Sequence, residues 1–155
     1  MELRPVTKTV KTPAERFTGD VYLNPVFSDD DAPLVVGLVR FTPGARTNWH
    51  SHANGQLLVC TDGVGLVAGR DGTTIRLRAG ESVWTPPGQE HWHGGTADTM
   101  MCHYAILDET PARDATTWLE PVTDEQYAAA NNTPGPSPDH VTPGAMPAQR
   151  LRACP

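Results

Sequence analysis

Turn-forming residues divide this chain into short apolar segments. It contains 14 glycines and 15 prolines, and the Val-, Leu- and Ile-rich runs between them have the length of single β-strands. The clearest runs are residues 34–41, 56–60, 64–69, 73–78, 81–85 and 99–107, and strand-like sequence begins at Phe17. Asp71 and Gly72 favour a hairpin between two of them. About eight strands suit a jelly roll or a small barrel, so the predicted fold class is all-β.

One short helix is predicted near the C-terminal end of the apolar sequence. In residues 122–130, VTDEQYAAA, Thr123 and Gln126 have the spacing of a capping box. Residues 1–16 are polar and punctuated by proline, and residues 131–155 are rich in proline with almost no apolar periodicity. We therefore expect an N-terminal arm (1–16), one barrel domain (17–130) with the helix packed outside, and an irregular tail (131–155) that adds no core.

Charge and cysteine content argue against several classes of function. The formal net charge is −6 and the 12 basic residues are scattered, which disfavours nucleic acid and anionic membrane as partners. No apolar segment is long enough to span a bilayer, and residues 1–17 lack the apolar core of a signal peptide. Cys60, Cys102 and Cys154 are widely spaced and odd in number, unlike a disulfide framework. We expect a cytoplasmic protein.

The segment NWHSHANGQ, residues 48–56, places two histidines two positions apart. Residues two apart in a strand share a face, so His50 and His52 project into the same space with Cα atoms about 6.6 Å apart. Gln56 joins them if residues 53–55 form a three-residue loop with Gly55 in the left-handed region, which sets His52 across from Gln56. We prefer this loop because a two-residue turn would send Gln56 to the opposite face.

A second segment, GESVWTPPGQEHWHGG, repeats the pattern, and His91 and His93 again share a face. Two such pairs on neighbouring strands are hard to explain by packing, because each buried imidazole needs a hydrogen-bond partner. A divalent cation satisfies several imidazoles together. The sequence therefore predicts a metal site.

The spacing of residues in these two segments resembles the two motifs of the cupin family. The first motif matches Gly44, His50, His52, Gln56 and Gly63, with Gln at the position usually held by Glu, and the second matches Gly80, Pro86, Gly88 and His91. The resemblance implies a double-stranded β-helix, which is a jelly-roll-like barrel, with one ion in its mouth. By motif position the ligands are His50, His52, Gln56 and His91.

Over residues 17–127 the chain looks like the small single-domain bacterial cupins that include the manganese-dependent hydroxynitrile lyases. In those lyases the positions of Thr47, His93 and His103 lie around the metal and serve in substrate binding or proton transfer. Strict alternation from His50 puts Thr47 on the wrong face, so its inclusion requires a bulge. This chain has Leu107 where those lyases have Gln, a change that could weaken or redirect the chemistry.

The ligand types predict the chemistry of the ion. Gln56 offers a neutral oxygen, so three histidines and one glutamine leave the ion its full +2 charge and make it a stronger Lewis acid. The resemblance favours manganese, and the ligand set also permits iron, nickel, cobalt or zinc. A histidine that is free of the metal is the usual general base or acid, which makes His103 and His93 the candidates.

Three functions are compatible with this site. The first, which we favour, is a lyase: a 2-hydroxy compound binds through its oxygen, His103 takes the hydroxyl proton, and a carbon–carbon bond breaks. The second is an O2-dependent dioxygenase or an isomerase of a sugar-derived carbonyl compound. The third is a non-enzymatic protein that binds a small molecule. In each case the partner is a small molecule, and the apolar stretch 21–27 favours a homodimer or a dimer of dimers.

Overall fold

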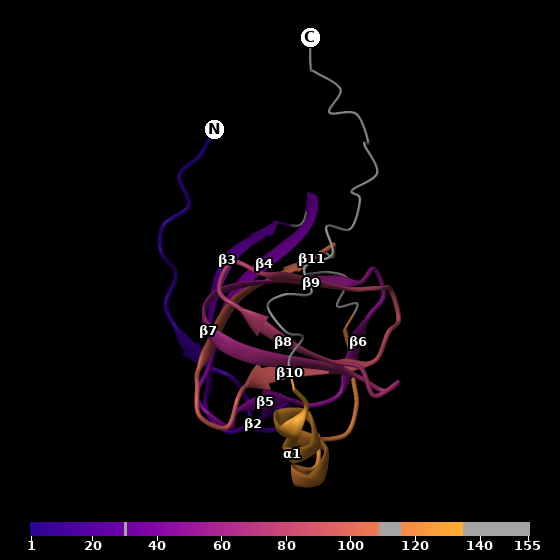
Figure 1. Ribbon diagram of the computed structural model, residues 1–155. Helices are drawn as coiled ribbons and strands as arrows, with labels where there is room; N and C mark the ends of the chain where they lie inside the picture. The colour runs from indigo at the N-terminus through magenta and orange to yellow at the C-terminus, as the bar shows by residue number, and fades with distance from the viewer. Residues whose placement is uncertain (30, 109–115, 135–155) are drawn as a thin grey trace.

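Twelve strands and one helix make up the described part of the chain, which is residues 1–29, 31–108 and 116–134 of a computed structural model. The strands curl into a barrel, and the helix lies outside it (Figure 1). The elements are β1 Val10–Lys11, β2 Phe17–Thr18, β3 Val21–Asp29, β4 Ala32–Phe41, β5 Arg46–Thr47, β6 His50–His52, β7 Gln56–Gly69, β8 Thr74–Arg78, β9 Ser82–Thr85, β10 His91–Gly95, β11 Met101–Leu107, β12 Thr116–Trp118 and α1 Asp124–Asn132. The predicted all-β barrel with one short helix is confirmed.

The longest strand, β7, joins the two halves of the barrel. Its first half pairs antiparallel with β9 and β11, and its second half pairs with β8 and β10. The prediction of separate strands at 56–60 and 64–69 is therefore wrong. The strand bends at Gly63 and so passes from one sheet to the other without ending. Gly63 has a φ of 76°, which glycine adopts readily and other residues adopt only with strain. The hairpin through Asp71 and Gly72 is confirmed by the β7–β8 pairing.

Two short strands escape prediction because they are too short to show a pattern. β1 lies within the N-terminal arm and pairs with β3, and β12 follows the last predicted strand and pairs with β6. Strands of two or three residues take their stability from their partners, so their sequences carry little periodicity. One of them, β12, contributes side chains to the cavity described below.

Apolar side chains form two clusters. The interior cluster fills the barrel and consists of Val21, Val39, Phe41, Ala45, Leu58, Cys60, Val67, Leu77 and Met101. The second cluster lies between the barrel and α1 and consists of Trp49, Leu66, Ala68, Trp92, Val122 and Ala130. The barrel therefore has its own apolar core, and the helix packs on the outside against a separate apolar cluster.

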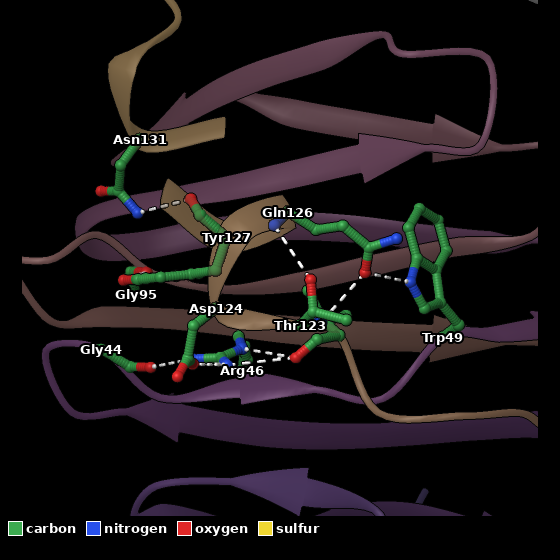
Figure 2. Close-up of polar contacts among 10 residues, drawn as sticks. Gly44, Arg46, Trp49, Gly95, Thr123, Asp124, Gln126, Tyr127 and Asn131 are labelled. Atoms are coloured by element: carbon green, nitrogen blue, oxygen red, sulfur yellow. Dashed lines mark hydrogen bonds and ion pairs between the residues drawn. The ribbon is translucent and has the colours of Figure 1, made fainter. Parts of the chain in front are cut away.

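Helix α1 is anchored to the strand that leads into the first histidine pair (Figure 2). The predicted capping box is confirmed, since Thr123 and Gln126 each bond a backbone amide of the other. The buried guanidinium of Arg46 donates to Val122 O and, at 2.6 Å, to Asp124, and it lies over the ring of Tyr127. These contacts fix the segment just before His50 from outside the barrel. No helix in the described residues is long and apolar enough to cross a membrane.

Candidate metal centre

The two histidine pairs meet inside the barrel, as predicted. β6 and β10 pair antiparallel with His50 directly opposite His91. Because alternate residues share a face, His52 and His93 point to the same interior. All four side chains are buried, and His52, at 5 % exposed, is the most accessible. Strand pairing thus gathers residues some forty positions apart in the sequence into one cluster.

His50 is the centre of this cluster. Its ring centroid lies 4.3 Å from that of His91, 5.1 Å from that of His52 and 5.2 Å from that of His93. One ring nitrogen each from His50, His91 and His93 lie within 4.8 Å of one another, which is close enough to share a metal ion. The cluster therefore includes His93 as well as the three histidines that the family resemblance implies as ligands.

Backbone carbonyls orient two of these rings. Nδ1 of His50 lies 3.0 Å from Asn48 O, and Nδ1 of His91 lies 3.0 Å from Gln89 O. Since a carbonyl only accepts, Nδ1 carries the proton in both rings and Nε2 keeps its lone pair. This is how proteins orient histidines that bind metals through Nε2.

Gln56 supplies the observation that best fits a cation. Its Oε1 lies 2.9 Å from Nε2 of His91, and the Gln56 side chain is buried. With Nδ1 of His91 donating to Gln89, this contact brings two lone pairs together, which is unfavourable on its own. A cation shared by both atoms satisfies them. The donor set therefore fits a divalent ion.

The turn between His52 and Gln56 has the predicted conformation, but the strands on its two sides do not pair as predicted. Gly55 has φ 82° and its N–H donates to His52 O, as expected of a three-residue loop. The expected pairing of His52 with Gln56 is wrong. β6 pairs with β10 and β12, whereas Gln56 begins β7 and pairs with Thr85 and Leu107. The loop carries the chain from one sheet to the other, and both side chains still line one cavity.

Thr47 reaches the cavity because the strand is interrupted. β5 ends at Thr47 and β6 begins at His50, so the two residues between them break the alternation. The irregularity that the sequence required is present. Thr47 is 2 % exposed, lines the cavity, and accepts a hydrogen bond from the backbone N–H of His93 at 3.1 Å. Its own hydroxyl proton remains available for donation.

His93 and His103 lie one behind the other. His93 lines the cavity, and its ring contacts that of His103 at 4.9 Å. His103 is fully buried and stacks on Phe41 with 5.7 Å between centroids. Within the described residues, Nδ1 of His93 and both ring nitrogens of His103 have no hydrogen-bond partner. Of the two predicted proton-transfer residues, His93 is the one with access to a bound molecule.

Polar and apolar side chains both line the cavity. Its volume is about 170 Å³. The polar lining residues are Thr12, Thr47, His50, His52, Gln56, His93 and Thr116, and the apolar ones are Phe17, Leu23, Val39, Ala105, Leu107 and Trp118. Leu107, at the position where the resemblance implies Gln, is one of the apolar lining residues. A molecule with one compact apolar group and one polar group matches this shape.

Comparisons with known proteins agree with this geometry. The family model described as "Cupin domain" matches residues 37–107. An (R)-mandelonitrile lyase from Granulicella tundricola is 45% identical over 118 residues, which cover 76% of this chain and 89% of that protein. The chain belongs to the cupin family. The predicted membership is thus confirmed.

Solved structures show the same fold. A cupin-like protein from Thermotoga maritima is 32% identical, with a TM-score of 0.76, and the match covers 86% of this cupin and 100% of that chain. A cupin 2 conserved barrel domain protein from Rhodopseudomonas palustris is 20% identical, with a TM-score of 0.60 over 80% of this cupin and 81% of that chain. The second likeness shows the fold alone.

Among the cavity residues of this cupin that escaped sequence analysis, Thr116 and Trp118 contact the histidine cluster. Thr116 and Trp118 come from β12, where Thr116 lies opposite His52 and Trp118 opposite His50. The hydroxyl of Thr116 lies 3.1 Å from Nδ1 of His52, and the ring of Trp118 stacks on His50. The T-x-W spacing of residues 116–118 mirrors H-x-H, which is the one signal in the sequence that could have revealed them.

Burial keeps four imidazoles of this cupin neutral. Desolvation lowers the pKa of His50 and of His93 well below the usual value, and it also lowers the pKa of His91. It lowers the pKa of His103 to about 4. Apart from histidine, the described residues that line the cavity include no acidic or basic side chain. The interior therefore offers lone pairs near neutral pH, as a metal site requires.

These pKa shifts predict acid sensitivity of the metal-free cupin. A histidine with a depressed pKa binds its proton in the unfolded chain first, so stability declines as pH falls from 6.5 toward the folded value. For His103, with a folded pKa of about 4, the decline amounts to as much as about 3 kcal/mol. Urea unfolding of chelator-treated protein from pH 7 to 4 measures it. The His103→Leu variant should show a shallower decline, and equal slopes would contradict this prediction.

Proposed function

We propose that this cupin is a metal-dependent lyase that cleaves a hydroxynitrile into a carbonyl compound and hydrogen cyanide. The observation that carries the proposal is the group of buried, neutral imidazoles in a cavity whose other lining side chains are mainly apolar. The relative with 45% identity, an (R)-mandelonitrile lyase, supports the choice of reaction. A hydroxynitrile has the matching shape, because a hydroxyl and a nitrile share one carbon beside an apolar substituent.

His50, His52, His91 and Gln56 would hold the divalent ion, for which manganese is our first choice. The carbonyl-oriented rings of His50 and His91 and the lone-pair contact between His91 and Gln56 support this set. When bound, such an ion polarises the substrate hydroxyl and lowers its pKa. Four neutral ligands leave its charge undiminished.

The side chains around the ligands then handle the proton. Thr47 donates a hydrogen bond from its hydroxyl to the substrate and keeps its proton throughout, while its oxygen accepts from the His93 N–H. His93 takes the proton of the substrate hydroxyl, since it lines the cavity and is neutral. The bond between the carbinol and nitrile carbons breaks as the oxygen forms the carbonyl, and the electron pair leaves with cyanide. His93 returns its proton to give hydrogen cyanide, so the reaction is balanced.

His103 acts through His93 in this scheme. The sequence favoured His103 as the base, and its full burial behind His93 leads us to assign it a positioning role. The rings of His93, His103 and Phe41 contact one another, with centroids 4.9 to 5.7 Å apart, so His103 packs with Phe41 against His93 and holds the His93 ring toward the cavity.

Two measurements test the proposed function together. Purified protein should contain stoichiometric divalent metal, and it should release cyanide from mandelonitrile under anaerobic conditions, with activity lost on chelation and restored by the metal. Metal-loaded protein that releases no cyanide above the buffer rate would overturn the lyase. Turnover that is strictly coupled to O2 uptake would instead support a dioxygenase.

We also propose that the protein is a homodimer or a dimer of dimers in the cytoplasm. Exposed apolar side chains on neighbouring strands support an interface, with Val10 on β1, Val26 on β3 and Leu34 on β4 each at least 40 % exposed. The free thiols of Cys60 and Cys102 fit a reducing compartment. A monomer in sedimentation at micromolar concentration would count against the assembly.

A further inference from the structure

An aromatic wall stands beside the histidine cluster, outside the proposed ligand set. The ring of Trp118 stacks on His50, with centroids 5.0 Å apart and an interplanar angle of 28°. Phe17 packs against the same indole at 5.6 Å, and the guanidinium of Arg16 lies 5.3 Å from its centroid. Both Trp118 and Phe17 line the cavity. The indole is therefore held by His50, Phe17 and Arg16, and a bound molecule can contact the part of its surface that lines the cavity.

Strand pairing fixes where this wall stands. In the β6–β12 ladder Trp118 is the direct partner of His50, so the indole and the imidazole leave their strands toward the same side. Thr117, between the two inward residues, is exposed. The indole is thus placed by backbone register next to the atoms that would bind the polar part of a substrate.

The size of the cavity limits what can contact the indole. An apolar protein cavity of about 150 Å³ binds benzene, so the volume of about 170 Å³ found here admits one six-membered ring with a small polar group. Aromatic rings gain from offset-stacked or edge-to-face contact with an indole beyond the burial of their area. An aliphatic group of similar size gains only the burial.

We propose that Trp118 is a specificity-determining residue, which selects substrates carrying a single aromatic ring over aliphatic ones. The proposal rests on the proposed function for the identity of the polar head group, and on the geometry of the aromatic wall for the preference itself. Phe17 and Arg16 are positioning residues in this selection, because they hold the indole in place.

The test compares two substrates in the metal-loaded protein. Trp118→Leu should lower kcat/KM for mandelonitrile about tenfold or more, mainly through KM, and change kcat/KM for propanal cyanohydrin about threefold or less. Trp118→Phe should keep most of the preference, because it keeps a ring. Trp84→Leu is the matched control, since Trp84 is 56% exposed and does not line the cavity, and it should leave both substrates unaffected.

Metal content and ligand binding separate this proposal from the proposed function. Trp118→Leu should retain full metal and should weaken binding of benzyl alcohol, measured by calorimetry, far more than binding of 1-propanol. An equal loss for both alcohols, or loss of the metal, would overturn the specificity role. If wild-type protein cleaves neither hydroxynitrile, the lyase proposal fails, while the two alcohols still decide whether Trp118 selects an aromatic ring.

Discussion

Replacing His50 and His52 together by alanine should leave the protein without stoichiometric metal while the barrel stays folded. Both rings belong to the proposed ligand set, and His50 lies at the centre of the cluster. Loss of one residue that merely orients a ligand costs about 10- to 100-fold in metal affinity, so loss of two ligands should cost well over 100-fold. Cyanide release should fall to the buffer rate. Elemental analysis and far-ultraviolet circular dichroism measure the two halves of this prediction.

Ser51→Ala is the control for this double variant. Ser51 lies between the two histidines and points to the other side of β6, so its loss should change neither metal content nor activity. Stoichiometric metal in the double histidine variant would overturn the ligand set and the mechanism built on it.

Replacing His93 by alanine should have the opposite signature, with full metal content and a rate reduced about 100-fold or more. That loss is the usual scale for removal of a general base. His103→Ala should reduce the rate less, because His103 acts only by holding His93. The measurements are metal content and kcat for mandelonitrile in the same preparations.

The position of His93 makes this variant a sharp discriminator. One of its ring nitrogens lies within 4.8 Å of nitrogens from His50 and His91, so His93 has the geometry of a ligand as well as that of a base. Metal loss in His93→Ala would identify it as a ligand and would require another proton acceptor. A larger loss of rate in His103→Ala than in His93→Ala would restore His103 as the base.

Much of the fold follows from short-range patterns in the sequence. The apolar run at residues 34–41, the alternation in residues 99–107 and the capping box at Thr123 each describe structure within a few residues, and each is present. The continuity of β7 through Gly63 and the pairing of β12 with β6 are long-range matters. They depend on which strands meet, and a local pattern does not encode that.

The candidate site shows the same division. The H-x-H spacing correctly places His50 with His52, and His91 with His93, on one interior face. Alternation shows on which side of a strand a residue lies but not how far its side chain is from the cavity. It therefore could not show that His93 lines the cavity while His103 packs behind it. Nor could it show Trp118, whose strand becomes recognisable only beside β6.

Strand β12 also affects the length of the shortest segment of this protein that could retain the site. The segment matched by the family model, residues 37–107, contains every proposed ligand and every proposed proton carrier. It omits Thr116 and Trp118, which contact the rings of His52 and His50, and Asp124, the ion-pair partner of Arg46. A transplant of the motif region alone would carry the reactive groups without the side chains that aim them, so the smallest transferable unit extends through the helix.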